Sequence, residues 1–108
     1  MDTDLRIKVL LSLQRALLGE ITPEMRAVAV QWSPNRIAIR VYTDGEAPAE
    51  VREDFDASVV TQVVADFSFP DQGDPSVEFE FARCDAPTRL PDWGQLVYAR
   101  AEAGEAAG

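Results

Sequence analysis

The residues best suited to chemistry in this sequence are carboxylates, and they are concentrated in one stretch. Residues 44–80 contain eleven of the 19 acidic residues of the chain and only one basic residue, Arg52. The whole chain of 108 residues has a net charge of −9, so the remainder is close to neutral. Carboxylates gathered in this way can bind a basic protein and steer its approach. They can also form a solvated helix face that serves solubility, and both interpretations stay open at this stage.

Most catalytic chemistry lacks its usual side chains here. Histidine is absent and cysteine occurs once, as Cys84. Serine- and cysteine-based machinery that needs an imidazole is therefore excluded, and one thiolate cannot build a zinc site. No P-loop, dinucleotide-binding or nucleophile motif occurs. We predict no enzyme, cofactor or metal site, and an enzyme that uses carboxylates and arginine is kept as a third alternative. Asp71 and Asp74 could bind a divalent metal, but they fit a polar turn better.

Two sets of residues are candidates for binding a partner. The first set is acidic and surrounds the start of the second predicted helix: Glu46, Glu50, Glu53 and Asp54. The second set is mixed and comes from two predicted strands: Arg40, Tyr42, Glu78 and Glu80. Each strand alternates, so its two members point to one side. If the strands share a sheet face, the four side chains form either cross-strand pairs on a solvated face or a polar and aromatic surface for a partner.

Charge and cysteine content also limit the partners and the compartment. An isoelectric point near 4.3 argues against nucleic acid, because phosphate binding requires a basic face, and against anionic membranes. The lone Cys84 cannot form an internal disulfide, which is typical of a reducing compartment. The N-terminus does not resemble a signal peptide, and no apolar run approaches the length of a membrane span. We therefore expect a cytoplasmic protein with a protein partner.

Periodicity in the sequence predicts an α+β fold. Ile37, Ile39 and Val41 alternate with polar or small residues, as a half-buried strand requires, and other segments repeat at helical spacing. The predicted order is α-β-β-α-β-β, with helices over 4–18 and 48–67 and strands over 25–32, 36–43, 77–82 and 93–100. We expect two hairpins to form a four-stranded antiparallel sheet, with both helices on one face. Residues 1–102 should form a single domain, and residues 103–108 a frayed tail.

Several segments of the chain resemble a family of small acidic bacterial proteins. They are residues 15–23 (RALLGEITP), 26–28 (RAV), 44–46 (DGE), 63–67 (VVADF) and 97–100 (VYAR). The resemblance covers most of residues 10–102 and consists of turns, helix ends and core positions. Members of this family are similar to the immunity proteins that accompany bacterial toxins. The resemblance therefore implies an inhibitor that binds a toxin, and it implies no catalytic residue.

Our leading hypothesis is a non-enzymatic protein-binding domain, an immunity-type inhibitor that covers a basic toxin with its acidic surface. The alternative is a small homodimeric domain that associates through an open sheet face. The outward-facing apolar residues, together with Tyr42 and Tyr98, motivate that alternative.

Overall fold

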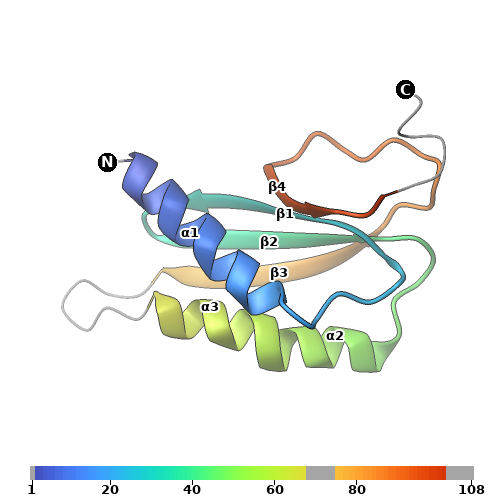
Figure 1. Cartoon of the computed structure of the whole chain (residues 1–108), viewed down its shortest axis with the longest axis horizontal. Helices are drawn as coiled ribbons and strands as arrows, with labels where there is room; N and C mark the ends of the chain where they lie inside the picture. The colour runs from blue at the N-terminus through green and yellow to red at the C-terminus, as the bar shows by residue number, and fades with distance from the viewer. Residues whose placement is uncertain (1, 68–74, 102–108) are drawn as a thin grey trace.

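The computed structural model describes residues 2–67 and 75–101 of the chain (Figure 1). The predicted α+β class with helices and a four-stranded sheet is confirmed. The expected second helix is one continuous run of three segments, with a π-helical turn in its middle. In chain order the elements are α1 (Asp2–Leu17), β1 (Met25–Ser33), β2 (Arg36–Thr43), α2 (Ala49–Phe55), η1 (Asp56–Val60), α3 (Thr61–Asp66), β3 (Ser76–Arg83) and β4 (Gln95–Ala99).

The first half of the chain follows its local signals closely. Helix α1 ends before Gly19, whose φ of 78° is the left-handed conformation that a glycine adopts at least cost. Strands β1 and β2 then form the predicted antiparallel hairpin, with Ser33 opposite Arg36. Pro34 and Asn35 make the two-residue turn between them, in keeping with the turn preferences of both residue types.

The prediction of a purely antiparallel sheet with a second hairpin is wrong. The strands are ordered β3-β2-β1-β4, and β3 runs parallel to β2 while β4 pairs antiparallel with β1. Between β2 and β3 the chain returns along the sheet as the long helical run, so β3 starts at the same end as β2. Residues 84–94, which we call the covering segment, then carry the chain to the opposite edge, where β4 completes the sheet.

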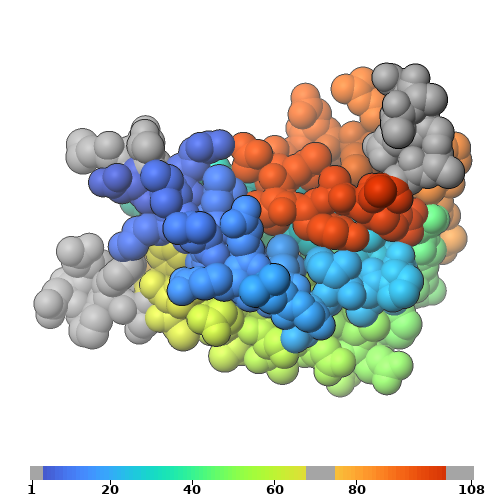
Figure 2. All heavy atoms as spheres, in the orientation of Figure 1, coloured from blue at the N-terminus to red at the C-terminus, as the bar shows by residue number. Residues whose placement is uncertain are grey.

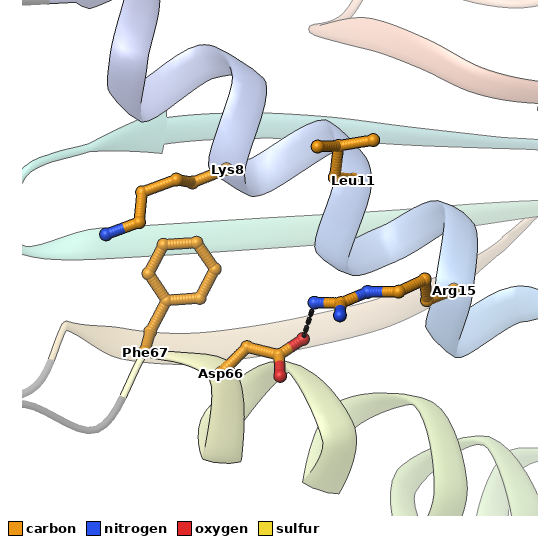
Figure 3. Close-up of a pocket in the computed structure, with 5 residues that line it drawn as sticks. All are labelled: Lys8, Leu11, Arg15, Asp66 and Phe67. Atoms are coloured by element: carbon orange, nitrogen blue, oxygen red, sulfur yellow. Dashed lines mark hydrogen bonds and ion pairs between the residues drawn. The ribbon is translucent and has the colours of Figure 1, made fainter.

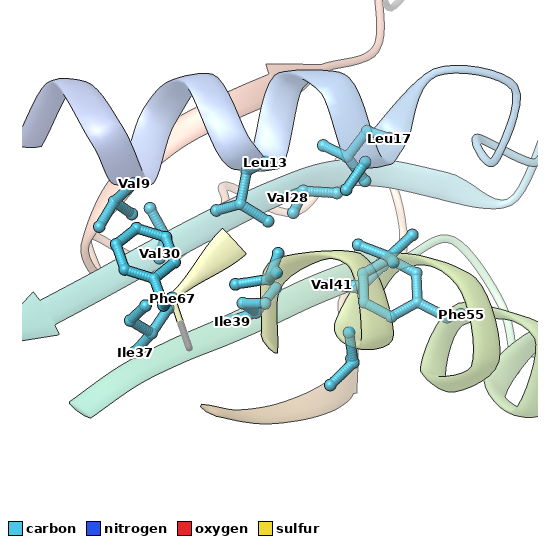
Figure 4. Packing of buried hydrophobic residues seen from close by; sticks show 14 of the residues in the cluster. Val9, Leu13, Leu17, Val28, Val30, Ile37, Ile39, Val41, Phe55 and Phe67 are labelled. Carbon is cyan, nitrogen blue, oxygen red and sulfur yellow. The ribbon is translucent and has the colours of Figure 1, made fainter. Parts of the chain in front are cut away.

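Both helical runs pack on one face of the sheet, as expected (Figure 4). Val9, Leu13 and Leu17 of α1 lie against Val28 and Val30 of β1 in the main core. The second run supplies the rest of the helical side of this core, and its buried members are Phe55, Val59, Val60, Val63 and Phe67. Because these side chains repeat along the inner side of each helix, the acidic residues in the first half of the second run, Glu50, Glu53, Asp54 and Asp56, are left exposed.

The opposite face of the sheet is partly covered by the covering segment. Ala27, Ala29 and Tyr42 form a small second core there, against which Leu90 and Trp93 pack. The face that the sequence suggested to be open is therefore closed at the end where Tyr42 lies.

Candidate functional site

The acidic residues at the start of the second helical run are exposed and carry no ion pair within the described residues. They are Glu46, in the loop after β2, and Glu50, Glu53 and Asp54, on α2. By contrast, the other acidic residues of the stretch that the structure describes are mostly paired: Asp44 with Arg100, Asp66 with Arg15, Glu78 with Arg36, and Glu80 with Arg40. We call this set, Glu46, Glu50, Glu53 and Asp54, the acidic surface of the molecule.

Glu78 and Glu80 share the sheet face opposite the helices with Arg36 and Arg40. The Glu78 Oε1 atom lies 2.8 Å from Arg36 Nη2, and Glu80 Oε1 accepts a hydrogen bond of 2.6 Å from Arg40 Nε. The hydrogen bond from Arg36 lowers the pKa of Glu78. These contacts are the cross-strand pairs that the alternation of the two strands allowed.

Arg40 and Tyr42 connect this sheet face to the covering segment. The Arg40 guanidinium stacks over the ring of Trp93, with its central carbon 4.1 Å from the ring centroid, a cation–π contact. Tyr42 is 1% exposed, so its side chain offers no surface to a partner. Of the predicted mixed set, the structure leaves the two glutamates about half exposed and buries the tyrosine.

The predicted site residues therefore do not form one cluster. Glu46, Glu50, Glu53 and Asp54 lie on the outer side of the helical layer or just before it, whereas Arg40, Tyr42, Glu78 and Glu80 lie on the other face of the sheet. Phe55 connects the two groups, because its ring lies 5.7 Å from that of Phe79 and 5.4 Å from that of Phe81. The end of α2 thus packs against β3.

Arg26 was not anticipated from the sequence as a functional or structural residue. It is 3% exposed, and its Nη1 donates to the carbonyl oxygens of Cys84 (2.7 Å) and Thr88 (2.8 Å). These bonds fasten the covering segment to the sheet. A buried guanidinium requires such partners, since an unpaired one is costly to desolvate. The only signal in the sequence is one arginine inside the apolar run of β1.

Carboxylates also anchor the start of the loop between β2 and α2. Asp85 accepts hydrogen bonds from the Gly45 N–H (2.6 Å) and from Arg83 Nε (2.9 Å). Asp44 binds Arg100 Nη2 at 3.1 Å and the Ala86 N–H at 3.3 Å. These bonds hold the loop that carries Glu46 against the covering segment.

Replacing Asp85 by asparagine is expected to reduce the acid sensitivity of folding. The hydrogen bond from Arg83, and then that from the Gly45 N–H, lower the pKa of Asp85 below its ordinary value of 3.8. Because the unfolded chain then binds the proton first, the stabilisation is complete above about pH 5 and disappears as the pH falls through the folded-state pKa. Urea unfolding at a series of pH values down to about pH 3 measures this loss.

The matched control for that experiment is Asp92→Asn, which removes an exposed carboxylate with no ion pair in the described part of the chain. We expect Asp85→Asn to lose less stability on acidification than the wild type, and Asp92→Asn to follow the wild type. Equal slopes for the wild type and Asp85→Asn would contradict this assignment.

A shallow groove between α1 and α3 was also not predicted (Figure 3). It has a volume of about 250 Å³ and is lined by Lys8, Leu11, Arg15, Asp66 and Phe67. Arg15 and Asp66 close its floor with a contact of 3.1 Å, and the Ser12 hydroxyl donates to the same carboxylate at 2.6 Å. In Figure 2, α1 crosses the middle of this face and the acidic helical run forms its lower margin. The groove and the acidic surface are therefore separate features.

Two kinds of site are not found in the part of the chain that the structure describes. Within residues 2–67 and 75–101, no three or more acidic or cysteine side chains converge as a metal site would require. Asp71 and Asp74, the candidate metal pair, lie outside the described residues. None of the helices in these ranges combines the length and the apolar character that crossing a membrane demands.

Comparison with known proteins bears on the immunity-type interpretation. No match was found among the curated proteins. The family described as MafI2 immunity protein matches residues 6–102, a range that includes every described strand and most of α1. This match confirms the resemblance to immunity-type proteins that the segments in the sequence carried. Because it extends over almost the whole chain, the chain belongs to the MafI2 immunity protein family.

Proposed function

We propose that this protein binds and neutralises a basic toxin through its acidic surface, the set Glu46, Glu50, Glu53 and Asp54. Membership of an immunity protein family supports a toxin as the partner. The observation that carries the choice of surface is the contrast in pairing. Asp44, Asp66, Glu78 and Glu80 are paired with arginines, whereas these four, gathered between residues 46 and 54, are exposed without an ion pair within the described residues.

The geometry suits an electrostatic partner more than a small ligand. The four carboxylates project from a loop and a convex helix rather than into a cavity, so they can meet a complementary protein surface. A charged patch of this kind accelerates encounter and excludes partners of the same sign. Carboxylates laid over the basic cleft of a toxin would also occupy the place of an anionic substrate. Inhibition then needs no chemical step by this chain.

Neutralising the acidic surface is expected to slow binding of the toxin. In the variant Glu50→Gln/Glu53→Gln/Asp54→Asn, we expect the association rate constant to fall by about tenfold or more at low salt, because steering is lost. The partner to use is a candidate toxin domain from the genomic neighbourhood of this chain, with its active site inactivated. Stopped-flow or surface-based kinetics at about 0.05 M and 0.5 M salt measure the rate.

The matched control is Asp4→Asn/Glu20→Gln/Asp92→Asn, which changes the net charge equally outside the acidic surface. We expect this control to retain most of the wild-type association rate. If the two triple variants slowed binding to the same extent, net charge alone would explain the effect and the proposed surface would be wrong. If the toxin domain bound neither the wild type nor the variants, the proposed function would fall.

The alternative of a homodimer through an open sheet face stays a prediction. The covering segment occupies part of that face, and Tyr42 lies beneath it.

A further inference from the structure

Strand β3 is an edge strand whose outer backbone groups are free in the described structure. It pairs with β2 in parallel along its whole length, from Ser76 to Arg83, and with no other described strand. The N–H groups of Ser76 and Cys84 donate toward the β2 side, to Asn35 O (3.0 Å) and Thr43 O (2.8 Å). Because N–H and C=O groups alternate between the two sides of a strand, the even-numbered residues between them also face β2.

The outward groups therefore belong to Val77, Phe79 and Phe81. None of the three forms a backbone hydrogen bond on that side with any described residue. Three alternate residues with free N–H and C=O groups are the template that an added strand requires. Their side chains are only half buried, although they point toward the helical layer.

Negative charge lies along one face of this edge. On the sheet face opposite the helices, Glu78 and Glu80 are 53% and 57% exposed, and their contacts with arginine use only Oε1. On the other face, the end of α2 packs against β3 through Phe55, whose ring lies near those of Phe79 and Phe81. A segment added to β3 would therefore lie against Glu78 and Glu80 on one side and near the end of the acidic helix on the other.

A second copy of this chain does not suit the edge. If two copies of β3 paired in antiparallel fashion, each residue with outward backbone groups would lie opposite another such residue of the second copy. The residues between them, which include Glu78 and Glu80, would then lie opposite residues of their own kind as well. The two-fold registers centred on Glu78, Phe79 or Glu80, which give the longest overlaps, each place a glutamate directly opposite a glutamate. These non-hydrogen-bonded positions bring side chains closest together, and like charges opposite one another are destabilising.

We infer that β3 is the edge to which the toxin adds a basic, extended segment. Its lysine or arginine side chains would alternate so that they face Glu78 and Glu80, and the residues between them would be apolar and cover Phe79. The acidic surface on α2 would then steer the partner, and the edge would fix its register. This inference rests on the proposed function, because it concerns the same partner.

Amide hydrogen exchange tests the edge directly. In the free protein, the amides of Val77, Phe79 and Phe81 should exchange faster than those of Glu78, Glu80 and Ala82, which face β2. On addition of the inactivated toxin domain, the three outward amides should slow by about tenfold or more, as new backbone hydrogen bonds form. If the toxin binds and these amides are unchanged while others slow, the inference is overturned and the proposed function stands. If the toxin does not bind, both fall.

A proline variant gives a second, independent test. In Val77→Pro the outward N–H is replaced by the proline ring, and no bond to β2 is removed. Ala99→Pro is the matched control on β4, because the Arg100 N–H faces β1 and the Ala99 N–H therefore faces outward. We expect Val77→Pro to weaken toxin binding by about tenfold or more, and Ala99→Pro to bind like the wild type. Wild-type affinity for a folded Val77→Pro variant would contradict the inference.

Discussion

Replacing Phe55 by alanine is expected to lower the free energy of unfolding by about 3–5 kcal/mol, the usual cost of removing a buried aromatic ring. Phe55 is 1% exposed and its ring contacts those of Phe79 and Phe81. The cavity would lie between the end of α2 and the edge strand β3. Urea unfolding followed by circular dichroism measures the loss.

Two further variants serve as controls for the loss of stability in Phe55→Ala. Phe55→Leu keeps an apolar side chain in place and should cost less than the alanine variant, since less volume is removed. Leu18→Ala, at a position 77% exposed, should change stability by no more than about 0.5 kcal/mol. A loss in Phe55→Ala as small as that in Leu18→Ala would show that α2 is not held on the sheet by this ring.

The second large effect is expected at Arg26. Substitution by methionine keeps much of the side-chain volume but removes the donor shared by Cys84 O and Thr88 O, so both part-buried hydrogen bonds are lost. Hydrogen bonds to charged groups are worth about 1.5–3 kcal/mol each, so we expect a loss of about 3 kcal/mol or more. The covering segment should loosen first, because these bonds fasten it.

Trp93 provides the local signal for that experiment. It lies in the covering segment under Arg40, so its fluorescence should respond to Arg26→Met, and a Trp32→Phe background isolates the Trp93 emission. Arg26→Lys retains a charge and one donor group and should fall between the wild type and the methionine variant. If Arg26→Met had the same urea midpoint of unfolding as the wild type and the same Trp93 emission, Arg26 would not be what holds the covering segment on the sheet.

The sequence predicted the faces of the elements better than it predicted their neighbours. Alternation at Ile37, Ile39 and Val41 identifies which side of β2 meets the core, and the structure agrees. The same kind of alternation in β3 is equally compatible with a parallel or an antiparallel neighbour, so it could not reveal the mixed sheet. Strand direction depends on where the intervening helical run returns the chain, and that is a property of tertiary packing.

In the candidate site too, features set by neighbouring residues in the sequence could be predicted, and features set by distant residues could not. The exposure of Glu50 and Glu53 follows from helical periodicity, because apolar residues occupy the inner side of the run. The burial of Tyr42 could not be predicted from its strand, since the residues that cover it arrive from a proline-containing connection more than forty positions later. The role of Arg26 depends on that same connection and was missed for the same reason.

The position of β4 has a consequence for the order in which the protein can fold. Strand β1 lies inside the sheet, yet one of its two neighbours is the last strand of the chain. Arg26 and Cys84 are 58 positions apart, and Pro23 and Arg100, which share a hydrogen bond, are 77 apart. Contacts of such separation slow folding, because a long loop must close before they form. During synthesis, β1 therefore remains an unprotected edge until the final residues of the domain leave the ribosome.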